Sequence, residues 1–359
     1  MFVLDSHCDT PSQILRLRNI ALDNDHSHVD FPKLKKGGVD GSFFALYIPA
    51  SLGTADAEVY AWRLLDALKS TVNANSDCAR FAYNSNDAFR NQAEGLFSVF
   101  VGLENGSPID STSKLAEFYN AGIRYVTLCH SRDNGICDSC ASESKTWNGL
   151  SPFGKELISE MNKIGMVIDV SHISDESFYD VLEYTSKPVV ASHSCCRALA
   201  DHPRNMTDEM LRKLSDNGGV IQINMYPIFL DSGFQEILDS SGILEYAESI
   251  EAEFIADPSD ISKREKWYSV LDRLNGLVRP SYRKVVDHIE HAIEVAGVDH
   301  VGIGTDFDGI AVTPEGLEDV SKLRIIFDEM KARGYSEEEI GKVAGGNFLR
   351  VLDGVKVYK

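Results

Sequence analysis

Histidine and carboxylate residues follow most of the apolar segments of this chain, beginning close to its N-terminus. The opening stretch DSHCDTP places His7 and Asp9 two positions apart, directly after the apolar run at positions 2–4. A His-x-Asp pair alone is a weak signal that most often has no function. Whether this pair belongs to a metal site therefore depends on partners elsewhere in the chain.

Residues of the same types stand at the ends of later apolar runs. Glu104 occurs in GLENG, His130 in TLCHS, His172 in DVSH, His193 in ASHS and Asp306 in GTDFDG. Each has a structural alternative, because a histidine after a strand is often a hydrogen-bonded loop residue and a carboxylate there often caps the next helix. Four of the ten histidines follow predicted strands closely, however, which argues against a chance arrangement.

Imidazole and carboxylate ligands without cysteine are typical of zinc in an open, catalytic site. Five ligands exceed the three that one catalytic zinc takes, but they suit two ions that share a bridging carboxylate. Glu104 is the predicted bridge, because it is the lone carboxylate on a strand between the two ligand groups. One zinc would bind His7, Asp9 and Glu104, and the other Glu104, His172 and His193.

Such a site has a definite chemistry. A water held between two zinc ions has its pKa lowered towards about 7, so that a bridging hydroxide is available at neutral pH. Asp306 remains as a proton shuttle, which takes the proton of the water and later gives it to the leaving group.

The elements that position these residues alternate along the chain. Apolar runs predict strands of a parallel sheet covered on both faces, at 2–4, 41–48, 96–103, 123–129, 165–171, 188–192, 218–225 and 300–305. Helical patterns lie between them at 57–72 and 112–121, with further helix starts at Ser151-Pro152, Ser174 and Thr207. We predict a single α/β domain over 1–359, a (β/α)₈ TIM-type barrel whose strand ends share one mouth. An open doubly wound sheet is the alternative, but no G-x-G-x-x-G follows the first strand.

The segment 226–282 interrupts this alternation between the seventh and eighth predicted strands. It is acidic and largely helical in pattern, with EILDSSGILEYAESIEAEFI followed by REKWYSVLDRLNGL. We predict a helical insertion there. It is either a lid over the active site or a solvent-exposed helical segment without function.

Composition excludes several classes of protein. The 359 residues are 43% hydrophobic and 25% charged, as in soluble globular proteins, and the net charge is -20. This acidity argues against nucleic acids and anionic membranes as partners. No apolar stretch approaches a transmembrane helix, and we expect no signal peptide at the N-terminus and no lipid-anchor signal at the C-terminus. The seven scattered cysteines predict reduced thiols in a cytoplasmic protein rather than a disulfide framework, with a single local disulfide as the alternative.

An ordered series of motifs along the chain resembles those of the membrane (renal) dipeptidases, which are zinc metallopeptidases of the amidohydrolase superfamily. It comprises DSHCDTP, HVDFPKLKKGGVDGSFFALYIP, GLENG, AGIRYVTLCHS, GLSPFGKELISEMNKIGMVIDVSH, KPVVASHS, HPRNMTDEML and GIGTDFDG…PEGLEDVS. The likeness runs from residue 5 to about residue 350 and is weakest in 50–95 and 226–280.

The resemblance implies two Zn²⁺ per subunit in the arrangement above, and it adds roles for individual residues. His130 matches the histidine that polarises the scissile carbonyl, and Asp306 matches the catalytic acid. Arg204, in HPRNMTD, matches the arginine that binds the C-terminal carboxylate of a dipeptide, and Tyr226 falls where the family has a tyrosine near the substrate. The resemblance also implies a homodimer and tolerance of a C-terminal D-residue.

The chain departs from the family pattern at its cysteines. Cys8 lies between His7 and Asp9, where it could contact a metal or pack silently, and Cys137 and Cys140 form a CxxC after His130. The expected function is hydrolysis of dipeptides. The alternatives are an amidohydrolase acting on N-acyl amino acids or lactams, and a catalytically silent binding barrel, although none of the predicted ligands is missing.

Overall fold

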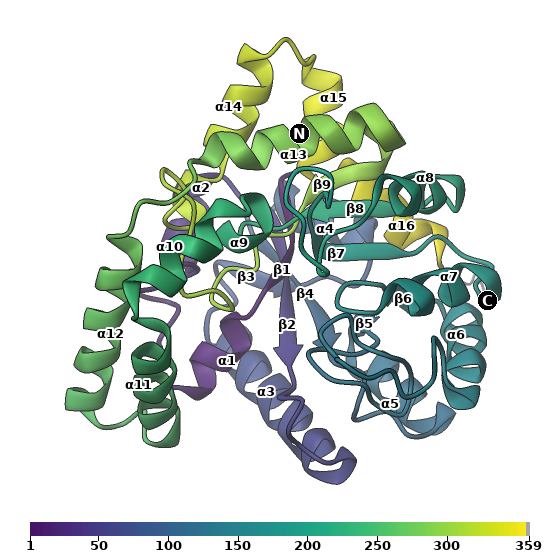
Figure 1. Ribbon diagram of the computed structural model, residues 1–359, viewed down its shortest axis with the longest axis horizontal. Helices are drawn as coiled ribbons and strands as arrows, with labels where there is room; N and C mark the ends of the chain where they lie inside the picture. The colour runs from purple at the N-terminus through teal and green to yellow at the C-terminus, as the bar shows by residue number, and fades with distance from the viewer. Residues whose placement is uncertain (357–359) are drawn as a thin grey trace.

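The computed structural model describes residues 1–356, and its centre is a sheet of parallel strands. Eight strands follow one another in the order β1-β2-β4-β5-β6-β7-β8-β9 around a nearly closed barrel (Figure 1). Their bounds are β1 Leu4–Cys8, β2 Gly41–Tyr47, β4 Phe97–Glu104, β5 Ile123–Thr127, β6 Val167–Asp169, β7 Val190–Ser194, β8 Val220–Ile223 and β9 Val301–Ile303. A bridge between Cys8 and Phe307 joins the two ends of the series. The predicted TIM-type barrel is confirmed.

Two details of the sheet differ from the prediction. β1 begins and ends later than the apolar run at 2–4, so that His7 lies inside the strand rather than after it. A short additional strand, β3 (Ala79–Phe81), pairs with β4 outside the barrel series. Its middle residue, Arg80, is exposed, and three residues without a continuous apolar run are too few to be recognised in the sequence.

Helices cover the outside of the barrel, and polar caps begin many of them. Ser111, Ser151, Ser174 and Thr207 each accept a hydrogen bond from a backbone N–H of the first helical turn. The helices outside the segment 226–282 are α1 Thr10–Leu15, α2 Phe31–Gly37, α3 Thr54–Ala74, α4 Ser85–Ala93, α5 Thr112–Ala121, α6 Pro152–Ile164, α7 Asp175–Tyr184, α8 Asp208–Asp216, α13 Tyr282–Ala296, α14 Arg324–Ala332, α15 Glu337–Gly341 and α16 Asn347–Gly354.

Apolar side chains close the end of the barrel at which the strands begin. Leu4, Val167, Val190 and Val220, at or near the starts of their strands, form one buried cluster with Phe348 of α16. The aromatic ring of Phe348 lies 4.9 Å from that of Phe43, centroid to centroid. Because this end is filled, polar side chains within the barrel gather at the opposite end, where the strands finish.

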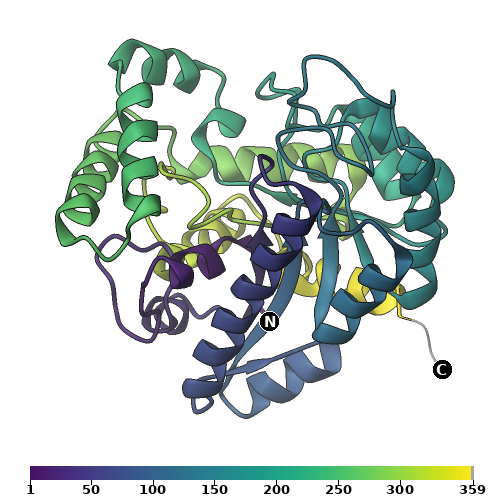
Figure 2. The same ribbon diagram turned by 90° about the horizontal axis from the view of Figure 1, so that it is seen from below.

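The segment 226–282 forms four helices: α9 Pro227–Leu230, α10 Gly233–Ser241, α11 Leu244–Ala256 and α12 Ile261–Asn275. Helices α10 to α12 lie together at one side of the molecule in both views (Figures 1 and 2). Phe234, Ile250, Phe254 and Trp267 belong to an apolar cluster of their own, separate from the main core. Among the described residues, no helix combines the length and apolar character needed to cross a membrane.

Candidate metal centre

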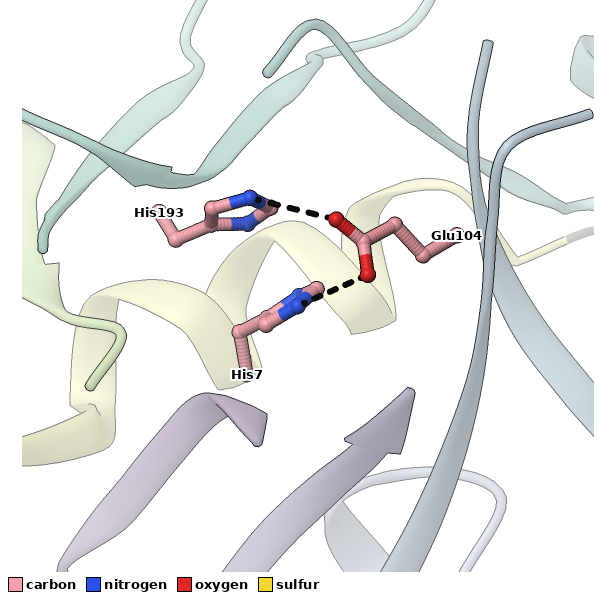
Figure 3. Close-up of side chains that lie close together, drawn as sticks. All are labelled: His7, Glu104 and His193. Atoms are coloured by element: carbon pink, nitrogen blue, oxygen red, sulfur yellow. Dashed lines mark ion pairs between the residues drawn. The ribbon is translucent and has the colours of Figure 1, made fainter. Parts of the chain in front are cut away.

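Glu104 is the last residue of β4 and lies at the centre of a buried group of histidines. Its Oε2 is 3.4 Å from Nε2 of His7, and its Oε1 is 3.2 Å from Nε2 of His172 and 3.5 Å from Nε2 of His193. The two carboxylate oxygens thus face different histidines, as Figure 3 shows for His7 and His193. Asp9 completes the group, with Oδ2 3.5 Å from Nε2 of His7.

The barrel brings these residues together from four strand ends. His7 is in β1, Glu104 ends β4 and His193 is in β7, whereas His172 follows β6. His172 has a φ of 71°, a left-handed conformation that is rare for a residue with a side chain. Such backbone strain is concentrated at functional sites, where surrounding structure maintains it.

The imidazole nitrogens and carboxylate oxygens of this cluster fit a metal ion. Two observations support this: some of these atoms have no hydrogen-bond partner, and a glycine leaves space beside them. Nε2 of His7 and Oδ1 of Asp9 are buried without a hydrogen-bond partner among the described residues, although buried polar atoms normally have one. A Cβ atom at Gly309 would lie 2.1 Å from Oδ2 of Asp9 and 2.7 Å from Oδ1 of Asp306, so only glycine leaves these carboxylates room.

Ligand atoms mutually within 4.8 Å form three overlapping sets that could hold a metal ion. These sets are His7, Glu104 and His193; Glu104, His130 and His172; and His7, Asp9 and Asp306. All five predicted ligands therefore lie in one cluster, together with the two predicted catalytic residues. The division of the ligands between two ions stays a prediction, because His193 lies close to both groups.

Asp306 lies beside this cluster and follows β9. Its φ is 62°, and its Oδ2 accepts a hydrogen bond of 2.9 Å from Nδ2 of Asn224, which follows β8. Burial and the negative charge of Asp9 raise the pKa of Asp306 to about 6. A carboxyl group with a pKa near neutrality can accept and return a proton at the pH of a cell.

His130 follows β5 and faces the same cavity. Its Nε2 is 3.7 Å from Oε1 of Glu104, and its Nδ1 is buried without a partner in the described part of the chain. Burial and the positive charge of Arg204 lower the pKa of His130 to about 3. The imidazole is therefore neutral at neutral pH, and a neutral imidazole can donate one hydrogen bond to an oxygen of a ligand.

Arg204 lines the same cavity as His130 and is buried. Its two Nη atoms donate to Oγ of Ser194 (3.3 Å) and to the backbone oxygen of His193 (2.9 Å), both uncharged acceptors. Its Nε is buried without a partner among residues 1–356. The Arg204 guanidinium also lies over the Phe229 ring, 5.4 Å from its centroid. A buried guanidinium with a free donor is suited to an anionic ligand.

One cavity of about 550 Å³ is lined by Asp9, Glu104, His130, His172, Arg204 and Asp306, whereas His7 and His193 are not part of its lining. Its lining joins the metal cluster to Arg204 and Tyr226, and it also includes Tyr47, Arg16 and Glu251. Glu251 belongs to α11 of the segment 226–282, and its Oε1 is 3.5 Å from Nη1 of Arg16.

The sequence did not predict Tyr47, Arg16, Glu251 or Asn224 as residues of the site, and it did not decide between the two roles considered for Cys8. Tyr47 ends β2 and Asn224 follows β8, so the strand-end rule that found the histidines could have found both. Arg16 and Glu251 carry no such signal, because neither follows a strand. Cys8 is fully buried in the main core, and its Sγ contacts Oγ of Ser42 at 3.3 Å. Cys8 therefore packs, and all seven cysteines are free thiols.

Comparison with known proteins identifies the family of this chain. A model of the membrane dipeptidase family (peptidase family M19) matches residues 1–359. Dipeptidase verJ of Clonostachys rogersoniana is 32% identical over 359 residues, which covers 96% of this chain and 80% of that protein. The crystal structure of the probable dipeptidase PvdM from Pseudomonas aeruginosa superimposes with a TM-score of 0.83 at 26% identity, over 99% of this chain and 95% of the other.

A more distant structure shares the fold. A metallopeptidase from Rhodobacter sphaeroides, liganded with a phosphinate mimic of the dipeptide L-Ala-D-Ala, superimposes with a TM-score of 0.80 at 23% identity, over 99% of each chain. The family match covers the whole chain and includes every residue of the metal cluster. The chain therefore belongs to the membrane dipeptidase family, peptidase family M19.

Proposed function

We propose that this protein is a binuclear zinc dipeptidase whose substrates include dipeptides with a C-terminal D-residue. The observation that carries the proposal is the position of Glu104, whose two oxygens face His7 on one side and His172 and His193 on the other. A carboxylate placed between two groups of imidazoles is what a pair of ions sharing one ligand requires.

His7, Asp9, Glu104, His172 and His193 would hold the two ions. Zinc bound there would supply a water of lowered pKa and polarise the scissile carbonyl group. The chain's own contribution is to keep these ligands buried and oriented, since Glu104, His7 and His193 are all nearly inaccessible to solvent.

Two further side chains would act on the substrate directly. We assign to neutral His130 a hydrogen bond to the carbonyl oxygen, which becomes stronger as negative charge develops there. Asp306 would take a proton from the attacking water and deliver it to the leaving nitrogen. The hydrogen bond from Asn224 holds the Asp306 carboxyl in place for both transfers.

Arg204 would define the length of the substrate. Arg204 lines the same cavity as Glu104 and His172, so a carboxylate bound to its guanidinium would belong to the residue next to the scissile bond. Only a dipeptide carries its free C-terminus at that position. Tyr226 lines the same cavity beside Arg204 and would contact the C-terminal residue.

The insertion would cover the cavity from one side. We propose that 226–282 acts as a lid, because α11 contributes both Glu251 and Ile255 to the lining of the cavity. A lid over the cavity keeps bulk water from the reacting groups.

Metal analysis of the purified protein, combined with a substrate panel, tests this function. We expect two zinc ions per chain and hydrolysis of L-Xaa-L-Xaa and L-Xaa-D-Xaa dipeptides. N-acyl amino acids, a lactam and C-terminally amidated dipeptides serve as matched comparisons, and we expect little turnover of any of them. Preferential hydrolysis of the N-acyl amino acids or the lactam would contradict the assignment as a dipeptidase.

A further inference from the structure

Asp169, the last residue of β6, is a fully buried carboxylate inside the barrel. Its Oδ1 accepts hydrogen bonds from the backbone N–H of Ser171 (3.0 Å) and of Ser192 (2.8 Å). Its Oδ2 accepts from the hydroxyl groups of Thr127 (2.5 Å) and of Ser192 (2.6 Å). Four donors surround this carboxylate, so it acts only as an acceptor. The hydroxyl proton of Ser192 therefore points at Asp169.

The same hydroxyl oxygen touches His193, one of the predicted zinc ligands. Oγ of Ser192 lies 2.7 Å from Nδ1 of His193. A hydroxyl group has one proton to donate, and Asp169 already receives it. Oγ of Ser192 can therefore only accept from His193, which requires the proton of the neutral imidazole to be on Nδ1.

This tautomer leaves the lone pair of His193 on Nε2. That atom is 3.5 Å from Oε1 of Glu104 and 2.8 Å from Nε2 of His172, at the metal cluster. A histidine that binds a metal through one nitrogen commonly donates the proton of the other to a fixed acceptor, which sets the tautomer and the orientation of the ring.

We infer that Asp169 and Ser192 are positioning residues that fix His193 as the Nδ1–H tautomer and so prepare its Nε2 to bind zinc. The inference rests on the proposed function for the role of the zinc, but the tautomer follows from hydrogen bonds within the chain. The relay runs from a carboxylate through a hydroxyl to the imidazole, across strands β6 and β7.

His7 offers a contrast within the same site. Its Nδ1 lies 2.8 Å from the hydroxyl oxygen of Tyr125, whose ring occupies the space that Gly102 leaves free, and 3.5 Å from Oγ of Ser192. A tyrosine hydroxyl both donates and accepts. No carboxylate holds the proton of Tyr125 away from His7 in the described structure, so that contact does not dictate a tautomer. The contact of Ser192 with His193 is much shorter, at 2.7 Å against 3.5 Å, so the relay fixes the tautomer of His193.

The substitution Asp169→Asn should reverse the direction of the hydrogen bonds from residue 169 through Ser192 to His193, with little change in the shape of the side chain. The two backbone N–H donors at Oδ1 keep the amide oxygen there, so the amide NH₂ takes the place of Oδ2 and donates to Ser192. The serine hydroxyl must then donate to Nδ1 of His193, and the imidazole proton moves to Nε2. Zinc affinity, measured by chelator competition, is expected to fall about 10- to 100-fold.

The first measurement needs no zinc. A long-range ¹H–¹⁵N correlation spectrum of metal-free protein labelled with ¹⁵N-histidine reports the tautomer, and the signal absent from a His193→Gln variant identifies His193. We expect the Nδ1–H form in the parent protein and the Nε2–H form in Asp169→Asn. An Nε2–H form in the parent protein would overturn the inference, even if no substituted variant folded.

Thr127→Val is the matched control for disturbing the buried carboxylate. It removes one donor from the same Oδ2 but leaves the direction of the Ser192 hydrogen bonds unchanged. We expect the parent tautomer and nearly the parent zinc affinity. Ser192→Ala removes the relay without reversing it, so its zinc affinity should fall less than that of Asp169→Asn. Equal losses in Thr127→Val and Asp169→Asn would refute the relay.

The outcomes separate this inference from the proposed function. Parent protein that binds no zinc but shows His193 as the Nδ1–H tautomer would contradict the zinc dipeptidase and leave the relay standing. Parent protein that binds two zinc ions but shows the other tautomer in its metal-free form would overturn the relay alone.

Discussion

The mouth of the barrel and the helical insertion are held together by different kinds of contact. At the mouth, side chains at or just after the ends of β1, β4, β5, β6 and β9 line one cavity, and buried polar atoms there lie close to one another. Helices α10 to α12 instead pack around an apolar cluster of their own, to which the barrel side contributes Val312. The mouth depends on the whole barrel, whereas the insertion is held mainly by local contacts.

We therefore expect substitutions in the two regions to affect activity differently. A substitution at the mouth alters groups that we propose bind metal or substrate, so activity should fall while the fold persists. A substitution in the apolar cluster of the insertion alters the cover of the cavity and should leave the metal cluster intact.

His193→Ala should abolish dipeptide hydrolysis and reduce the zinc content from two ions per chain to one. The substitution removes a ligand nitrogen that no neighbouring side chain can replace. Metal analysis and activity assays check this, with circular dichroism to confirm folding. His26→Ala, at a partly exposed histidine outside the cluster, is the control and should keep both zinc ions. Full activity of His193→Ala would contradict the two-metal site.

Asp306→Asn should retain both zinc ions while kcat falls by about 10²- to 10⁴-fold, the usual contribution of a general acid–base group. The amide preserves the shape of the side chain but cannot accept and return a proton. Metal analysis and steady-state kinetics on one dipeptide measure the two effects. Turnover close to that of the parent protein would remove Asp306 as the proton shuttle.

Arg204→Ala should lower kcat/KM for free dipeptides by about 10- to 100-fold, because a hydrogen bond to a charged group contributes about 1.5–3 kcal/mol. C-terminally amidated dipeptides, which lack the carboxylate, should be hydrolysed equally slowly by the variant and the parent protein. Arg212→Ala, at an exposed arginine of α8, controls for loss of charge. Equal losses for free and amidated substrates would contradict the carboxylate role.

Trp267→Ala should have the smallest effect on activity. Truncation of this buried side chain of α12 should weaken the local packing of the insertion by about 3–5 kcal/mol, as for other large-to-small substitutions in a core. Hydrogen exchange should become faster within 233–275 while the strands stay protected, zinc content stays at two ions and KM rises modestly. Val278→Ala, at a side chain that is 80% exposed, is the control. Loss of zinc from Trp267→Ala would show that the two regions are not independent.

The barrel and the cluster of candidate metal ligands could be predicted from the sequence for a common reason. The apolar runs were long enough to be recognised as strands, and a barrel requires that the ends of parallel strands meet at one mouth. His172, His193 and Glu104 could therefore be placed together although more than 60 positions separate Glu104 from His172. The rule failed where its signal was absent: β3 is too short, and Arg16 and Glu251 lie on helices or at their ends.

Periodicity, capping and strand ends are local properties, so the sequence was enough to predict the positions of the eight barrel strands, the helix starts at Ser151, Ser174 and Thr207, and the residues available as ligands. Tertiary structure alone decided how the atoms face one another. It turned the two oxygens of Glu104 towards different histidines and buried Cys8 in the core. It also connected Asp169 through Ser192 to Nδ1 of His193. The direction of a hydrogen bond depends on which neighbours compete for each proton, and only the folded chain brings those neighbours together.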